Sequence, residues 1–174
     1  MPDRRRFAEG TEVPVSKTRA ELDALLARHG ASQRAIFDDD EAGRAVVQFR
    51  MAERMARLEL RTVPPNAPDP TRADYNQKAD CAHGWNSWTV QRRKEWLAKQ
   101  RDQFAREAWR RLLLVTKAKL EIIADGASTF EREFLADLLL GDGTTVHEAI
   151  SERLAEVYRT GEVRPLLPAK GETA

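Results

Sequence analysis

The 174-residue sequence has one cysteine, Cys81. It also lacks any run of about 18 apolar residues of the kind that spans a membrane. A lone cysteine excludes a disulfide within the chain. The N-terminus has no charged-then-apolar leader, which argues against a signal peptide. We therefore expect a soluble, cytoplasmic protein that does not contact a membrane and that folds on its hydrophobic core alone.

Motifs that carry catalysis are also missing. The sequence has no glycine-rich loop of the kind that cradles a phosphate, since its helical-region glycines fall where helices end or turn: Gly126, Gly141, Gly143 and Gly161. No serine, cysteine or histidine has a recognisable nucleophile context. We therefore expect no catalytic residue and no cofactor. An enzyme site assembled from distant segments is the alternative, and Asp80, Cys81 and His83 would be the place to look.

Two groups of residues have metal-ligand chemistry, and neither predicts a metal site. Asp38–Glu41 is a run of acids, but consecutive acids in a hairpin turn diverge from one another, so a solvated turn is the better interpretation. Cys81 and His83 supply two ligands without partners, which do not make a zinc site. We expect no metal.

The chain changes its periodicity in a definite order. Residues 1–12 have no periodicity and are expected to form a flexible arm. In 13–63, a capping box at Thr18 and Glu21 opens a helix that Gly30 stops. Alternating apolar positions then predict a three-stranded antiparallel meander, with Val47, Phe49 and Met51 on one face of a strand and Ala56, Leu58 and Leu60 on one face of the next.

The second half of the chain is predicted to be helical. Residues 64–84 open with four prolines in seven positions and are expected to form a loop or linker. From Thr89 to Asp125 there is no proline or glycine, which predicts one helix of roughly 35 residues, about 50 Å long. Capping boxes at Ser128 with Glu131 and at Thr145 with Glu148 open two short helices.

These patterns together predict an α+β fold: an N-terminal helix and a three-stranded antiparallel meander, followed by a long helix and two short C-terminal helices. The helical region, 85–168, is expected to pack on the meander, and 169–174 to form a tail. The predicted core comprises Phe49, Met51, Leu58, Leu60, Trp109, Leu113, Phe134 and Leu154.

The near-neutral net charge of +1 conceals a division along the chain. Residues 90–120 hold ten basic and three acidic residues, a net +7, whereas 121–174 hold five basic and eleven acidic residues, a net −6. Such a division matters more for partners than the total does.

The cationic segment begins within "WNSWTVQRRKEWLAKQR", residues 85–101, which holds three of the four tryptophans. Excess positive charge beside aromatic rings suits a phosphate backbone with stacked bases, single- or double-stranded. The candidate nucleic-acid-binding residues are Trp85, Trp88, Arg92, Arg93, Lys94, Trp96, Lys99, Arg101, Arg106 and Arg110. Two alternatives stay open: a helix neutralised by the anionic C-terminal third, and a surface for a protein partner.

Two segments resemble a family of small phage- and prophage-encoded proteins: "VPVSKTRAELDALLARHGA" at 13–31, and 109–168 with its "T-F-E-x-x-F-L" element at Thr129–Leu135, its glycine turn at Gly143–Val146 and its closing Pro165–Pro168. The resemblance covers under half of the chain and implies a mobile-element setting. It implies no catalytic residues. In that setting the alternative to nucleic-acid binding is an interaction module, such as an inhibitor of a host defence or replication protein.

Self-association is a further expectation. A helix of about 35 residues is longer than a core of this size covers, so its first half projects or finds a partner. Trp96, Leu97 and Phe104 are too apolar to be left together in water, which favours a homodimer through residues 85–108. The alternative is that the 63–84 loop folds back over these rings within one chain.

Overall fold

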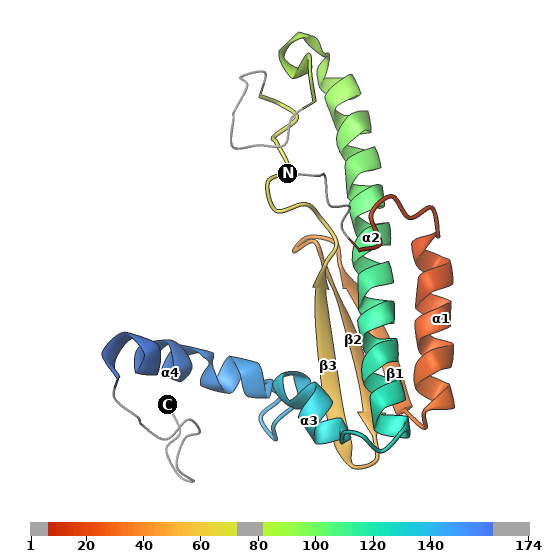
Figure 1. The fold of residues 1–174 in the computed structure, drawn as a ribbon. Helices are drawn as coiled ribbons and strands as arrows, with labels where there is room; N and C mark the ends of the chain where they lie inside the picture. The colour runs from red at the N-terminus through yellow and green to blue at the C-terminus, as the bar shows by residue number, and fades with distance from the viewer. Residues whose placement is uncertain (1–6, 73–81, 162–174) are drawn as a thin grey trace, which may run out of the picture. The chain divides into compact units, whose positions relative to one another are not determined.

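The computed structural model describes residues 7–72 and 82–161 (Figure 1). The predicted α+β fold is confirmed: an N-terminal helix and a three-stranded antiparallel sheet precede a long helix and short C-terminal helices. No described helix combines the length and the apolar character that crossing a membrane requires. The elements are α1 (Val15–Arg28), β1 (Ser32–Asp39), β2 (Arg44–Met51), β3 (Arg54–Arg61), η1 (Trp85–Ser87), α2 (Val90–Ala124), α3 (Phe130–Phe134), η2 (Leu135–Asp137) and α4 (Val146–Thr160).

The sheet has the strand order β1-β2-β3, which two hairpins produce. In the first turn, the Ala42 N–H donates to the Asp39 carboxylate at 2.9 Å, and Arg44 Nε donates to it at 3.2 Å. These bonds hold the pKa of Asp39 below its ordinary value. Asp38 and Asp39 thus end β1, and Asp40 and Glu41 lie in the turn. No group of three or more potential metal ligands is found in residues 7–72 and 82–161.

The period-two pattern predicted for the second and third strands is confirmed by burial. Val47 and Phe49 are buried in β2, and Ala56 and Leu58 are buried in β3, while the residues between them are more exposed. Two outer members of the predicted core are only half-buried: Met51 and Leu60.

Two of the three predicted capping boxes are wrong. α1 begins at Val15, so Thr18 lies inside the helix, where its side chain is buried and the N–H donates to the Pro14 carbonyl. Ahead of α3 the N-cap is Thr129, whose hydroxyl accepts from the Arg132 N–H, one residue after the predicted Ser128. The box at Thr145 and Glu148 is confirmed at the start of α4. The pattern S/T-x-x-E therefore marks the neighbourhood of a helix start more reliably than the cap itself.

The long helix is confirmed: α2 has 35 residues and ends before Gly126. The chain divides into two compact units, and most of α2 belongs to the first, which comprises Met1–Leu25, Ile36–Val46 and Glu59–Ala118. Within this unit Arg110 of α2 pairs with Glu21 of α1 at 2.6 Å, and Arg19 lies 5.2 Å from the Trp109 ring centroid. Its buried apolar residues include Leu22, Leu25, Ala45, Trp109 and Leu113.

The second unit comprises Leu26–Ala35, Val47–Leu58 and Lys119–Ala174. Its centre is a cluster of three phenylalanines, in which Phe49 of β2 makes edge contacts with Phe130 and Phe134 at centroid distances of 6.0 and 5.7 Å. The predicted core position Leu154 is wrong, because it is 40% exposed and α4 has no buried residue.

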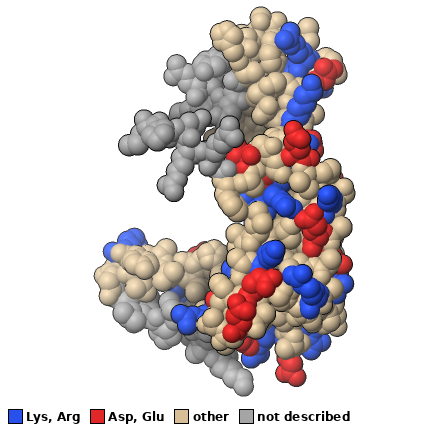
Figure 2. Space-filling view, turned by 45° about the vertical axis from the view of Figure 1, so that its right-hand side comes forward, with Lys and Arg blue, Asp and Glu red and all other residues tan. Residues whose placement is uncertain are grey.

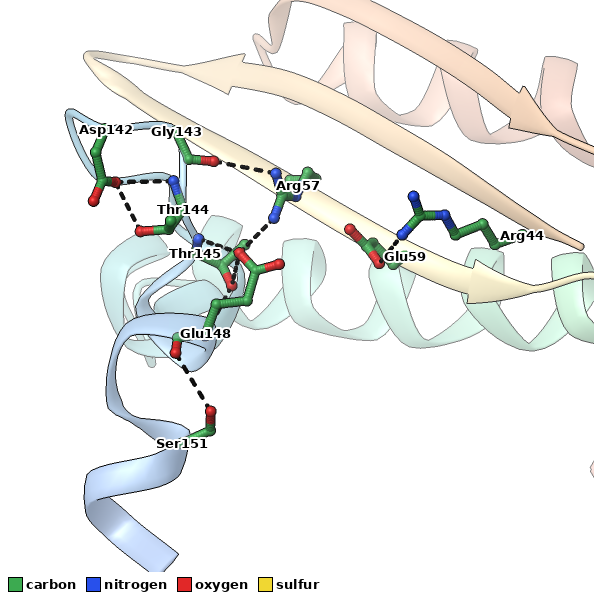
Figure 3. Close-up of polar contacts among 9 residues, drawn as sticks. All are labelled: Arg44, Arg57, Glu59, Asp142, Gly143, Thr144, Thr145, Glu148 and Ser151. Carbon is green, nitrogen blue, oxygen red and sulfur yellow. Dashed lines mark hydrogen bonds and ion pairs between the residues drawn. The ribbon is translucent and has the colours of Figure 1, made fainter. Parts of the chain in front are cut away.

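A polar cluster joins α4 to β3 within the second unit (Figure 3). Arg57 of β3 donates to the Glu148 carboxylate at 2.5 Å and to the Gly143 carbonyl at 3.1 Å. The same carboxylate accepts from the Thr145 N–H at 2.6 Å. The bond from the Thr145 N–H and the charge of Arg57 lower the pKa of Glu148. Glu148 therefore closes the capping box and holds the start of α4 against the sheet.

We predict that Glu148→Gln lowers the melting temperature by a few degrees at pH 7. The folded state favours the ionised Glu148, because its pKa lies below the ordinary 4.5. This contribution is present above pH 4.5 and is lost as the pH falls through the lowered pKa of the folded state. Thermal melts of wild type and variant from pH 7 to pH 3 should converge. Glu152→Gln, on the exposed side of α4, is the control, and a difference that does not change with pH would contradict the assignment.

Candidate nucleic-acid interface

Three tryptophans meet before and within the first turns of α2. Trp85 lies 6.3 Å from Trp88 and 5.9 Å from Trp96, measured between ring centroids. Trp85 is only 1% exposed, and its indole N–H donates to the Arg72 carbonyl at 3.1 Å. This ring therefore has no free face for a base, and the stacking role predicted for Trp85 is not available in this structure. Trp88 and Trp96 are half-buried and keep part of their surface.

Arg93 is buried and binds backbone carbonyls of its own chain, so it does not offer the predicted phosphate contact. It is only 4% exposed, and its guanidinium donates to three backbone carbonyls: those of Trp85 at 3.0 Å, Asn86 at 3.3 Å and Pro70 at 3.4 Å. The guanidinium also lies 5.5 Å from the Trp85 ring centroid. Arginine has five donors in a rigid fork, so one side chain can tie the Pro-rich segment and η1 to α2.

We predict that Arg93→Met destabilises the first unit by about 2 kcal/mol or more, because it removes the charge-assisted bonds from a buried guanidinium to three backbone carbonyls. Lys94→Met is the matched control, since Lys94 is the exposed neighbour of Arg93 on the same helix. Urea unfolding curves, monitored by tryptophan fluorescence, measure the stability of both variants. Equal midpoints for the two variants would show that the carbonyl contacts contribute nothing.

Two more of the predicted phosphate contacts are already paired within the first unit. Arg106 bonds with Asp102 and Gln103, and Arg110 bonds with Glu21. Both side chains are about a quarter exposed. A phosphate would have to replace these carboxylates, so neither arginine is a ready contact.

Four exposed cations remain in the N-terminal half of α2: Arg92, Lys94, Lys99 and Arg101. None of them has an ion pair with another residue among 7–72 and 82–161. Arg92 lies 4.5 Å from the Trp88 ring centroid. Residues seven apart lie close to one line along a helix, so Arg92 and Lys99 share one side of α2, and Lys94 and Arg101 share another. Figure 2 shows cationic and anionic groups interspersed on the face it presents.

A groove lies between α2 and the Pro-rich segment, which Figure 1 draws in yellow beside the helix. Its volume is about 190 Å³, and its apolar lining comes from Pro64, Ala67, Pro68, Trp96, Leu97 and Phe104. Gln100, Arg101, Gln103 and Glu107 complete it. Leu97 is only 5% exposed. The Pro-rich segment thus covers part of the apolar stripe within one chain, which weakens the reason for a dimer.

The expected alternative to a dimer was that the 63–84 loop folds back over these rings, and Pro64, Ala67 and Pro68 do line the groove with Trp96 and Phe104. The groove itself was not predicted, although a signal for it exists in the sequence. Arg93, Leu97, Gln100 and Phe104 follow a helical spacing of four, three and four residues, which places them on one face of α2. That face needed a cover, and the prolines nearby in the chain supply it. Of the suggested enzyme position, His83 is exposed, while Asp80 and Cys81 lie outside the described residues.

Comparison with protein-family models, curated proteins and solved structures finds no match for this chain. The surface of α2 and the groove are therefore the features that bear on a function.

Proposed function

We propose that the protein is a non-enzymatic nucleic-acid-binding accessory protein, of the kind that a phage or prophage encodes. The observation that carries the proposal is the set of four exposed cations on α2, Arg92, Lys94, Lys99 and Arg101, which have no ion pair in the described part of the chain. The half-buried Trp88, two residues before α2, and Trp96, within α2, lie 6.3 Å apart between ring centroids at the same end of the helix. This set is smaller than the ten residues that the sequence predicted, because Trp85, Arg93, Arg106 and Arg110 have structural partners.

The physical basis is the release of counterions. A cation that contacts a phosphate releases a condensed counterion, so binding weakens with salt by about 0.7 log units per contact for a single strand and about 0.9 for B-DNA, per log unit of salt. Four contacts therefore predict a slope of about −3 for a single strand and about −3.6 for a duplex. Charges that already have a carboxylate partner contribute less, because the partner must first be displaced.

We predict that replacing the four cations with glutamine lowers the affinity for labelled oligonucleotides and reduces the salt slope by about 3. The matched control replaces four exposed cations elsewhere in the chain with glutamine: Arg61, Lys117, Arg132 and Arg159. This control variant removes the same net charge and should keep most of the salt slope of the wild type. Fluorescence anisotropy from about 20 to 200 mM salt measures both variants. Equal losses in the two variants would show that only net charge matters, and absence of binding by wild type at low salt would refute the proposal.

A second candidate is a protein interaction module that uses α4. This helix has an amphipathic sequence but no buried residue, and Tyr158 is 85% exposed on it, near the exposed Leu154. Glu152 lies on the exposed surface of α4. The partner would offer an apolar groove with basic margins. This function predicts that Leu154→Glu with Tyr158→Ser abolishes binding to a purified partner, and that oligonucleotides do not bind at all.

A homodimer through residues 85–108 also stays a prediction. Trp96 and Phe104 keep part of their surface beside the covered Leu97. Light scattering at micromolar concentration, on wild type and on the variant Trp96→Glu with Phe104→Glu, tests it. A dimer that becomes a folded monomer would support the interface, and a monomer mass for both proteins would rule it out.

A further inference from the structure

The groove beside α2 has the composition of a site for a flat, apolar ligand that carries negative charge. Two aromatic side chains, Trp96 and Phe104, and two prolines, Pro64 and Pro68, supply its apolar lining. Arg101 also lines it, and this side chain is exposed and has no ion pair within the described residues. An aromatic surface next to an uncompensated guanidinium is the combination that binds single-stranded nucleic acids.

Among the described residues that line the groove, the one acid is already compensated. Glu107 accepts from the Gly10 N–H at 3.0 Å and from Gln103 Nε2 at 2.9 Å, and it lies 3.7 Å from Arg111. Its carboxylate is therefore satisfied by the protein, whereas Arg101 on the same groove is not. The charge that an occupant meets at this margin is positive, and this favours an anionic ligand.

The size and the polar groups favour one nucleobase. A volume of about 190 Å³ admits a single planar ring system but not a stacked base pair. Gln100 lines the groove and is exposed, and its side-chain amide has no hydrogen bond to another described residue. A free side-chain amide has both donors and an acceptor, which match the edge of an unpaired base. In a duplex this edge is occupied by the opposite base, so the groove selects against paired bases.

We propose that the groove takes one unpaired nucleobase of a single-stranded nucleic acid, with the adjoining phosphate on Arg101 and the edge of the base on Gln100. This inference rests on the proposed function and specifies its ligand. Lys94 lies seven residues before Arg101 on the same side of α2, about 10 Å along the helix axis, so it meets a phosphate further along the same strand.

The test compares three labelled ligands of equal length by anisotropy at low salt: a poly-thymidine strand, the same backbone with abasic positions throughout, and a blunt duplex. The strand with bases is expected to bind about 5- to 100-fold more tightly than the abasic strand, which is the range that stacking of one base supplies. The strand with bases should also bind more tightly than the duplex when the affinities are compared per phosphate.

A variant that fills the groove distinguishes the contribution of the base site to the affinity from the contribution of the exposed cations. Ala67→Phe places a ring in the groove, and Ala98→Phe, on the exposed side of α2, is its matched control. Ala67→Phe should bind the strand only as well as it binds the abasic backbone, while Ala98→Phe should behave as wild type. Gln100→Ala, at an exposed position, should also lose affinity for the strand and not for the abasic backbone. Circular dichroism melts confirm that each variant is folded.

The outcomes distinguish the two proposals. Equal affinity for the strand and the abasic backbone, or unchanged binding by Ala67→Phe, would overturn the groove as a base site while binding to phosphates stands. Tighter binding to the duplex would overturn it in favour of the cationic sides of α2. No binding to any of the three ligands would overturn both proposals and favour a protein partner.

Discussion

The buried guanidinium of Arg93 is the interaction on which the candidate interface depends. It joins the carbonyl of Pro70 on the Pro-rich segment and the adjacent carbonyls of Trp85 and Asn86 on η1 to the first turns of α2. Proline-rich backbone has few N–H donors of its own, so it is held through its carbonyls, and a five-donor side chain suits that need. The result is that the N-terminal part of a 35-residue helix has a cover within its own chain.

The cations of α2 are of two functional kinds. Arg93 has a structural role, and Arg106 and Arg110 are held by carboxylates of the same unit. What remains in the N-terminal half of α2 is a small set of exposed cations, of which Arg101 lines the groove, and this is different from a continuous basic face. A protein with such a surface is expected to bind nucleic acid weakly and with a strong dependence on salt, and to owe any preference to the groove instead of to charge.

The sequence predicted the elements well because their signals are local. Absence of proline and glycine across 35 positions fixed the extent of α2, and alternation in β2 and β3 gave the buried face. The roles of Trp85 and Arg93 were not predictable in the same way. The charge and the aromatic content of this stretch are the same whether Arg93 is solvated or buried. Its burial depends on contacts such as the one with Pro70, more than twenty residues away. The exposure of Leu154 likewise depends on packing that periodicity does not describe.

The four tryptophans allow a direct test of nucleic-acid binding at the N-terminal end of α2, because each indole N–H gives its own NMR signal. Trp85 and Trp109 are buried, while Trp88 and Trp96 are half-buried near the exposed cations. On addition of a single-stranded oligonucleotide at low salt, we expect the indole signals of Trp96 and Trp88 to shift and those of Trp85 and Trp109 to stay in place. Unchanged signals for all four tryptophans, or a shift confined to Trp109, would contradict binding at the N-terminal end of α2.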